Sequence, residues 1–176
     1  MLTVIIGPMF SGKTSYLIDI FEKNNKKNIE TLVINHKFDN RYGKFLSNHD
    51  NKKIECCFIE KMSEIYKILN NIKSKKYKTI LINEGQFFKD LYNVISVLVN
   101  YDYDIYVCGL NADSNMEKFG TILDIIPLAD NVINLKSKCK ICNKIANFTK
   151  RLNNNKDKIL IGNDNLYIPV CRKCFN

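Results

Sequence analysis

The sequence has no apolar run as long as the stretch of about 20 residues that crosses a membrane. It also has no basic segment ahead of the short apolar run at its N-terminus, so a secretory signal peptide is not expected. It contains no internal repeat. We therefore expect a soluble, cytoplasmic protein, and 176 residues are enough for one main domain with a core of ordinary size.

Acidic side chains are outnumbered by basic ones, 18 against 27, which gives a formal net charge of +9. A basic surface suits a nucleic-acid partner, but it also suits an enzyme whose ligands are polyanionic nucleotides. The lysines are scattered among asparagines, as in segments 23–28 and 70–76, and form no single stripe interleaved with aromatic residues. We expect no nucleic-acid partner and no membrane partner.

The most informative segment is GPMFSGKT at 7–14, which follows an apolar run and precedes a helical pattern. It fits the pattern G-x-x-x-x-G-K-[ST], in which backbone N–H groups cradle phosphate oxygens. Lys13 is expected to reach the β- and γ-phosphates, and Thr14 to place its hydroxyl on Mg²⁺. The start of the following helix adds positive potential to this ATP or GTP site. The predicted phosphate-binding residues of the loop are Gly7, Pro8, Met9, Phe10, Ser11, Gly12, Lys13 and Thr14.

Short buried runs alternate with helical patterns over residues 1–136. Strands are predicted at Leu2–Ile6, Thr31–Ile34, Thr79–Ile82, Ile105–Leu110 and Val132–Leu135. Helices are predicted after Thr14, over Ile65–Ile72 and over Leu91–Leu98. This order favours an α/β fold with a parallel sheet, helices on both faces and nucleotide at the carboxyl ends of the strands. Residues 37–60 show no clear period and are predicted to form a loop.

The pattern changes near Lys136, and residues 137–176 are predicted to form a second, small domain with a hairpin around Ile159–Ile168. Two C-x-x-C pairs lie in this part, and together they can complete a closed tetrahedral four-cysteine site for structural zinc. Two disulfides or a thioredoxin-like redox motif are the alternatives. An intracellular setting disfavours the first, and the lack of a strand–helix context disfavours the second. The predicted zinc ligands are Cys139, Cys142, Cys171 and Cys174.

Three cysteines and both histidines lie outside these pairs. Cys56, Cys57 and Cys108 stand in apolar surroundings and are predicted to be ordinary buried thiols. His36 and His49 are predicted to be structural or exposed, not catalytic.

The strand predicted at Thr79–Ile82 runs directly into Asn83 and Glu84. At the carboxyl end of a strand in a nucleotide-binding fold, Glu84 can take a proton from an attacking hydroxyl. Taken alone, this glutamate is better explained as a solvated strand end. The following Gly-Gln-Phe-Phe places an amide and two rings at the same point and favours a site.

Together with segments further along the chain, these motifs resemble the type II thymidine kinase family, the cellular and poxviral type. The match runs in order through nearly all of the sequence. Besides the phosphate loop and the cysteine pairs, the resemblance is carried by Asp39-Asn-Arg-Tyr42, Glu84-Gly-Gln-Phe-Phe88, Phe119-Gly120, Phe148-Thr-Lys-Arg-Leu152, Ile161-Gly162 and Tyr167.

The resemblance implies transfer of the γ-phosphoryl group of Mg²⁺-bound ATP to the 5′-hydroxyl of thymidine or deoxyuridine. It implies a RecA-like core and a small zinc domain whose lasso loop closes over the base. Members are usually homotetramers inhibited by dTTP. By position, Glu84 is the general base, Lys13 clamps phosphate and Arg41 stabilises the transferring charge.

The resemblance also assigns the two halves of the substrate site. Further ATP or phosphate contacts fall on Asp39, Arg41, Asn83 and Gln86. The nucleoside pocket and lasso fall on Met9, Phe87, Leu110, Ser114, Phe119, Thr149, Lys158, Ile159, Leu160, Ile161, Gly162 and Tyr167.

Three positions depart from the family pattern. Asn83 stands where an aspartate is usual, so we expect weaker Mg²⁺ affinity. Ser114 stands where the human-like pattern has a phenylalanine, and it cannot stack on a base. Asn163 replaces the second glycine of the lasso pair, and asparagine tolerates left-handed backbone better than most residues.

Three other functions remain open from the residues alone. The first is a nucleic-acid-dependent ATPase with a zinc ribbon, against which stand the short chain, the missing second set of motor elements and the scattered charge. The second is a kinase-derived nucleotide-binding protein without chemistry, which Asn83 favours and Lys13, Thr14 and Glu84 oppose. The third is a kinase for another nucleoside.

Overall fold

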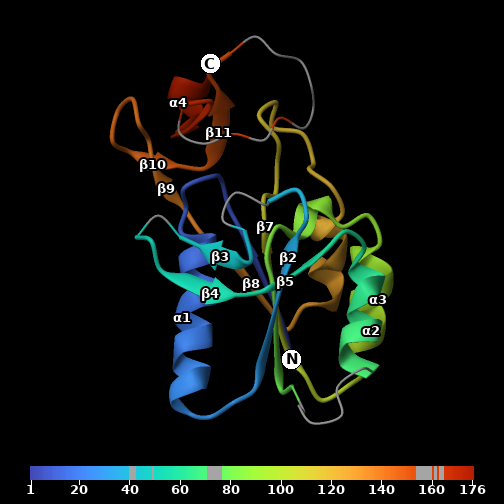
Figure 1. Cartoon of the computed structure of the whole chain (residues 1–176). Coiled ribbons are helices and arrows are strands. Elements are labelled where there is room, and N and C mark those ends of the chain that lie inside the picture. Colours follow the sequence, from blue (N-terminus) through green and yellow to red (C-terminus); the bar gives the residue numbers. More distant parts are fainter. Residues whose placement is uncertain (40–42, 49, 71–76, 154–159, 161, 163–164) are drawn as a thin grey trace.

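The computed structural model describes all of the chain except residues 40–42, 49, 71–76, 154–159, 161 and 163–164 (Figure 1). Arg41, His49, Ile72, Lys158, Ile159, Ile161 and Asn163, which figure in the sequence analysis, lie outside the described residues. Among the described residues, no helix has both the length and the apolar character needed to span a membrane.

A six-stranded sheet, parallel throughout as predicted, forms the centre of the larger unit, in the order β5-β2-β6-β7-β1-β8. Its strands are β1 (Leu2–Ile6), β2 (Thr31–His36), β5 (Cys57–Ile59), β6 (Thr79–Ile82), β7 (Asp104–Gly109) and β8 (Asn131–Asn134). Strands β1 and β6 are buried along their whole length, because apolar side chains on both faces meet helices. Ile6 aligns with Gly109 of β7 and with Asn134 of β8, so these strands end at one edge.

Helices cover both faces of the sheet, which confirms the predicted doubly covered architecture (Figure 1). On one face, Leu17 and Ile18 of α1 (Lys13–Lys26) pack in one apolar cluster with Ile5 and Leu81. The other face carries α2 (Ile65–Asn70), α3 (Leu91–Leu98) and the 3-10 helix η3 (Ile122–Leu128), which share the larger cluster. Two short 3-10 helices, η1 (Met62–Glu64) and η2 (Gly85–Phe87), connect strands to helices.

The prediction that residues 37–60 form a loop is wrong. Strands β3 (Phe45–Ser47) and β4 (Lys53–Glu55) pair as an antiparallel hairpin, and β5 adds an edge strand to the main sheet. Each strand has three residues, and a period of two cannot be recognised over so short a run. Leu46 and Ile54 are the buried apolar residues that anchor this hairpin to α1.

The smaller C-terminal unit consists of two antiparallel pairs and a short helix, α4 (Arg172–Phe175). Strand β9 (Ser137–Lys138) pairs with β10 (Ile145–Ala146), and β11 (Phe148–Arg151) pairs with β12 (Tyr167–Val170). The hairpin predicted around Ile159–Ile168 is therefore misplaced, because its first strand lies earlier in the chain. Thr149 pairs with Pro169 across it, and the connection is too long for a local turn signal. The division into domains at 136–137 stays a prediction.

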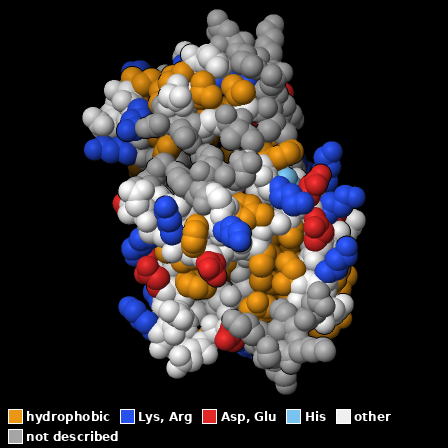
Figure 2. All heavy atoms as spheres, viewed as in Figure 1, with side chains coloured by type: hydrophobic (Ala, Val, Ile, Leu, Met, Phe, Trp, Pro, Cys, Tyr) orange, Lys and Arg blue, Asp and Glu red, His pale blue; other side chains and the backbone are white. Residues whose placement is uncertain are grey.

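Basic side chains are spread over the face shown in Figure 2, with acidic ones among them. Pairs such as Lys52–Glu22 and Lys118–Asp124 join the two signs at N–O distances of 3.0 and 2.5 Å. The visible face shows no single basic stripe, in agreement with the scattered lysines of the sequence.

Candidate active site

The phosphate loop joins β1 to α1 at the carboxyl edge of the sheet. Gly12 has a φ of 84°, a left-handed conformation that favours glycine, and it precedes the first helical residue. A Cβ on Gly7 would lie 2.5 Å from the Leu135 carbonyl oxygen, so the loop packs directly against the end of β8. These two constraints explain why glycine is required at both ends of the motif.

Lys13 lies across the inside of this loop. Its Nζ donates hydrogen bonds to the carbonyl oxygens of Gly7 and Pro8, at 3.1 and 2.6 Å. Burial lowers the pKa of the Lys13 ammonium, and the nearby Glu84 charge opposes that shift. The ammonium is thus held at the centre of the loop, where phosphate oxygens would replace its carbonyl partners.

A single cavity is lined both by the phosphate loop and by the predicted nucleoside wall. The predicted site residues that line it are Met9, Phe10, Ser11, Gly12, Lys13, Thr14, Asp39, Glu84, Gln86, Phe87, Leu110, Ser114, Phe119, Thr149, Leu160, Gly162 and Tyr167. Among the described residues, Gly7, Pro8 and Asn83 were predicted for the site but do not line the cavity. Elements far apart in sequence, from the first loop to β12, therefore meet at one place.

Two hydrogen bonds tie the phosphate loop to the C-terminal unit. The Met9 N–H donates to Thr149 Oγ1 at 2.9 Å, and Ser137 Oγ donates to the Phe10 carbonyl oxygen at 2.9 Å. Tyr167 also donates from its hydroxyl to the Leu160 carbonyl oxygen at 2.7 Å. The unit that carries the cysteine pairs thus fixes one wall of the cavity.

Glu84 follows β6 in a left-handed conformation, with φ 55° and ψ 41°, which is uncommon for a residue with a side chain. Its Oε2 accepts a hydrogen bond of 2.5 Å from Gln86 Nε2, and Gln86 Oε1 accepts one of 3.0 Å from the Leu110 N–H. Strained backbone of this kind is often kept where it orients a functional group. Here it directs the carboxylate into the cavity lining.

Asn83 is part of a buried chain of amides and not of the cavity wall. Its Nδ2 donates to Asn35 Oδ1, and its Oδ1 accepts from the Cys108 thiol, both at 3.0 Å. Asn35 in turn donates from Nδ2 to Asp39 Oδ2 at 3.2 Å. The chain links the ends of β7, β6 and β2 and leads to Asp39, which does line the cavity.

Aromatic rings form the apolar side of the cavity. Phe87 and Phe119 meet edge to face at 5.6 Å between ring centroids, and Phe38 meets Phe87 at the same distance. His36 lies behind them, 2% exposed, with Nδ1 accepting from the Phe38 N–H and Nε2 donating to the Glu60 carbonyl oxygen. Burial lowers the pKa of His36, and its buried position and two hydrogen bonds agree with the predicted structural role.

Several lining residues were not among the predicted site residues: Ser15, Phe38, Ser47, Asn48, Ala112, Asp113 and Arg151. Asn48 is the clearest case, because its Oδ1 accepts from the backbone N–H groups of Asp50 and Lys52 while its Nδ2 donates to Ser15. The Asn-x-Asp spacing after Ser47 is a recognisable turn signal. It could have indicated that the Asn48 side chain bonds to nearby backbone, as it does beside Ser15 of α1.

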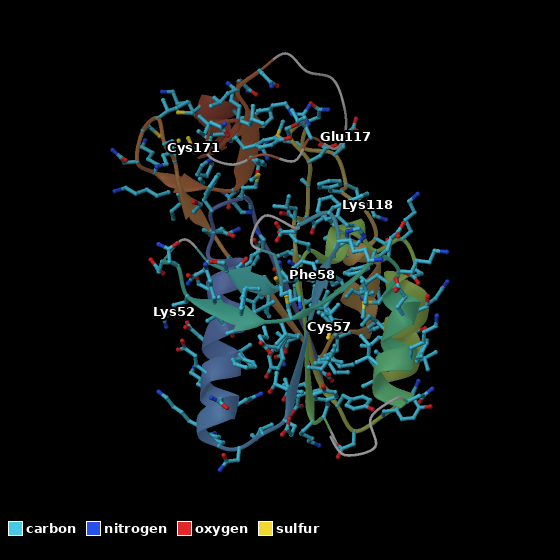
Figure 3. All side chains as sticks on the ribbon, viewed as in Figure 1. Lys52, Cys57, Phe58, Glu117, Lys118 and Cys171 are labelled. Atoms are coloured by element: carbon cyan, nitrogen blue, oxygen red, sulfur yellow. The ribbon has the colours of Figure 1, made fainter. Side chains whose placement is uncertain are left out.

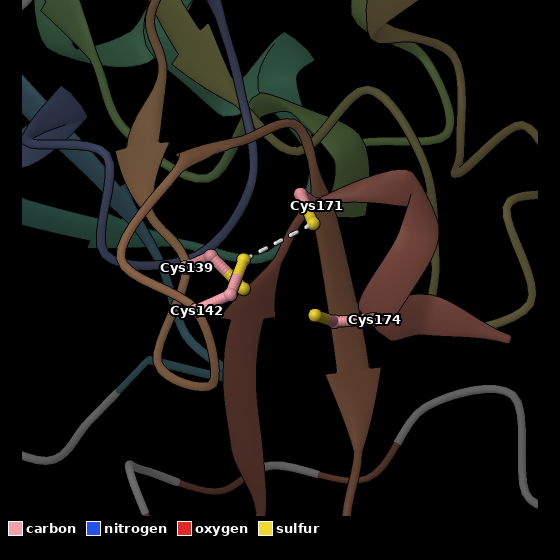
Figure 4. Close-up of side chains that lie close together, drawn as sticks. All are labelled: Cys139, Cys142, Cys171 and Cys174. Carbon is pink, nitrogen blue, oxygen red and sulfur yellow. Dashed lines mark hydrogen bonds between the residues drawn. The ribbon is translucent and has the colours of Figure 1, made fainter.

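The four cysteines of the C-terminal unit come together as predicted (Figure 4). Their sulfur atoms all lie within 4.8 Å of one another, and the Cys142 and Cys171 sulfurs are 3.5 Å apart. Zinc bound to four thiolates at about 2.3 Å requires sulfur separations of this order. The set of four sulfurs fits a closed structural zinc site.

The other cysteines differ from one another. Cys108 is fully buried, and burial raises the pKa of its thiol to about 12. Cys56 is half-buried, and burial likewise raises its thiol pKa to about 12. Cys57, labelled in Figure 3, is exposed, so the prediction of a buried thiol is wrong there. It begins β5, which is an edge strand of the sheet formed by the described residues.

The sequence matches the thymidine kinase family over residues 1–175. The chain belongs to this family. It is 34% identical over 172 residues to the thymidine kinase of myxoma virus (strain Uriarra), covering 98% of this chain and 94% of the viral protein. It is 35% identical over 176 residues to that of Mycoplasma mobile, with 99% and 86% covered. It is 37% identical over 175 residues to that of Oryza sativa subsp. japonica, covering 97% of this chain and 64% of the plant protein.

Membership of the thymidine kinase family confirms the resemblance drawn from the motifs and identifies the chain as a kinase. The relatives named here are viral, bacterial and plant, and none of them favours a nucleic-acid-dependent ATPase. The family match covers both the sheet unit and the cysteine pairs.

Proposed function

We propose that this thymidine kinase family member transfers the γ-phosphoryl group of ATP to the 5′-hydroxyl of thymidine, and also of deoxyuridine, giving the nucleoside monophosphate and ADP. The observation that carries the proposal is the single cavity. It is lined by Lys13 and Thr14 on the phosphate side, by Phe87 and Phe119 on the apolar side, and by the Glu84 carboxylate.

Phosphoryl transfer needs alignment and charge neutralisation more than covalent chemistry. The loop N–H groups and Lys13 hold the transferring phosphate, while Glu84 accepts the proton of the attacking hydroxyl. We assign Mg²⁺ to the Thr14 hydroxyl and the Asp39 carboxylate, because both line the cavity and oxygen ligands suit this ion. Bound Mg²⁺ supplies neutralisation of the developing charge. Arg41 is proposed to add to it.

The nucleoside half follows from flat apolar walls and a few fixed polar groups. Phe87 and Phe119 meet edge to face, and such a pair suits a pyrimidine ring. Tyr167 holds the Leu160 carbonyl oxygen beside the cavity, which supports the proposal that lasso backbone hydrogen-bonds the base. One methyl group separates thymidine from deoxyuridine and discriminates by about 1–3 kcal/mol, so we propose both as substrates.

Four further properties are proposed from family membership. The cluster of four cysteines holds structural zinc, the protein assembles as a homotetramer, dTTP inhibits it, and it acts in the cytoplasm. Zinc at this place stabilises the unit that supplies Thr149 to the loop.

The test is product analysis with the zinc-loaded protein, Mg²⁺, ATP and a panel of nucleosides. We expect dTMP and dUMP to form, with rates for the two within about 10–200-fold of each other. The Lys13→Ala variant, prepared in the same way, is the control for product formed by contaminating kinases. Failure to phosphorylate either pyrimidine deoxynucleoside, in protein that still binds ATP, contradicts the proposal.

A further inference from the structure

Gln86 has an unusual position for a residue of a phosphate site. It is 3% exposed and lies in η2, two residues after the carboxylate of Glu84. Both ends of its side-chain amide are used, with Nε2 donating to Glu84 Oε2 and Oε1 accepting from the Leu110 N–H. Because a backbone N–H can only donate, Oε1 must face Leu110, and the donor end must face Glu84.

Two glycines make room for this side chain. A Cβ on Gly109 would lie 2.3 Å from Gln86 Oε1, and a Cβ on Gly120 would lie 1.8 Å from the Gln86 carbonyl oxygen. Gly120 also has a φ of 61°, which favours glycine. Strand β7 and the segment before η3 therefore enclose Gln86 closely, and its amide has little freedom to turn.

We propose that Gln86 is a positioning residue that links the Glu84 carboxylate to the Leu110 backbone, so that the general base stays at a fixed distance and orientation relative to the nucleoside wall. The inference rests on the proposed role of Glu84. It assigns Gln86 to the general base, because the two ends of its amide contact Glu84 and the Leu110 N–H. The second hydrogen of Nε2 remains available for the phosphate contact predicted from the sequence.

The physical effect has two parts. A donor fixed on one carboxylate oxygen stabilises the charged form, which is the form that accepts a proton. It also limits rotation of a side chain whose backbone is already in a sparsely populated conformation. Loss of the donor should therefore change the titration of Glu84 and the turnover number more than the binding of thymidine.

The first test follows the side-chain carboxyl of Glu84 by ¹³C NMR over pH, with its resonance identified by its loss in Glu84→Gln. Gln86→Met keeps the length of the side chain and removes the donor. We expect the Glu84 titration midpoint to rise by about 1 pH unit. Thr121→Val is the matched control, because it removes a 2.8 Å hydrogen bond to the Phe88 carbonyl oxygen and touches neither Glu84 nor Leu110.

A rise in Gln86→Met together with an unchanged midpoint in Thr121→Val supports the proposal. An unchanged midpoint in Gln86→Met overturns it, as does an equal rise in both variants, which would indicate general loosening of the segment. Gln86→Glu is the second variant should the methionine fail to fold, since it keeps an acceptor for the Leu110 N–H. Two carboxyl groups in contact share a proton, so the midpoint should again rise.

Kinetics give an independent readout. In Gln86→Met we expect the turnover number to fall about 10-fold, the Michaelis constant for thymidine to stay within about 2-fold, and the acid limb of the pH–rate profile to move to higher pH. A Michaelis constant that rises with an unchanged turnover number contradicts a positioning role. If the nucleoside panel gives no product with the wild type, the proposed function fails, while the titration still decides the role of Gln86.

Discussion

Changing Asn83 to aspartate tests the buried amide chain at the carboxyl edge of the sheet. Asn83 is 2% exposed, and its Nδ2 donates to Asn35 Oδ1 at 3.0 Å. In Asn83→Asp the Cys108 thiol keeps its acceptor, but an anionic oxygen faces the Asn35 oxygen. Asn35 cannot turn its amide over without loss, because its Nδ2 donates to Asp39 and its Oδ1 also accepts from the His36 N–H.

The expected loss is about 1–3 kcal/mol of unfolding free energy, the usual effect of leaving a buried polar group without its partner. At about 2–4 °C per kcal/mol for a protein of this size, the melting temperature should fall by about 2–12 °C at pH 8. A protonated carboxyl can donate to Asn35, so folding favours the protonated form and raises the carboxyl pKa. The loss is therefore full above that folded pKa and shrinks as the pH falls through it.

The assay is thermal unfolding of wild type and Asn83→Asp at pH 8 and pH 5.5. Asn93→Asp makes the same chemical change at an exposed position of α3 and serves as the control. Asn83 does not line the cavity, but its hydrogen bonds lead through Asn35 to Asp39, which does. Through this chain the added negative charge should lower the Mg²⁺ concentration that gives half-maximal rate, so stability should fall while Mg²⁺ affinity rises. A variant as stable as wild type at pH 8 would refute the argument from the amide chain.

Three further outcomes follow from the site. The unfolding free energy of the wild type should fall as the pH drops below about 6.5, because burial lowers the folded pKa of His36 and the unfolded chain binds the proton more tightly. In denaturant titrations, His36→Gln should reduce this dependence of stability on pH. The Cys174→Ser variant should lose zinc, as measured by metal analysis, and should melt at a lower temperature than wild type. The Thr149→Val variant should bind ATP more weakly, as measured by calorimetry, because it loses the hydrogen bond to the Met9 N–H. Ser114→Phe should lower the Michaelis constant for thymidine by adding a ring to the cavity lining, and a constant equal to wild type would count against base stacking there.

The sheet was predictable from sequence because its central strands are short apolar runs separated by helical patterns. Thr79–Ile82 is an example in which the predicted and observed bounds agree. The phosphate loop was equally clear, since its glycines and Lys13 are required by backbone conformation and charge. The zinc ligands were predictable because the C-x-x-C spacing of each cysteine pair can be recognised in the sequence itself.

Other features depend on contacts between distant segments. Strands β3 and β4 contain one buried apolar residue each, Leu46 and Ile54, and a single apolar residue gives no period to detect. The hydrogen bonds of Asn83 could not be predicted without knowing that Asn35 and Cys108 lie near the ends of neighbouring strands. Such polar partners are chosen by the register of the sheet, which a single sequence does not display.

The most direct test of the account is the turnover number of Glu84→Gln, measured with zinc-loaded protein at saturating Mg²⁺·ATP and thymidine. The account predicts a loss of about 10²-fold or more, with thymidine binding retained, because the amide keeps the size of the side chain but cannot accept the proton. A turnover number within a few-fold of wild type would contradict the assignment of Glu84 as the general base.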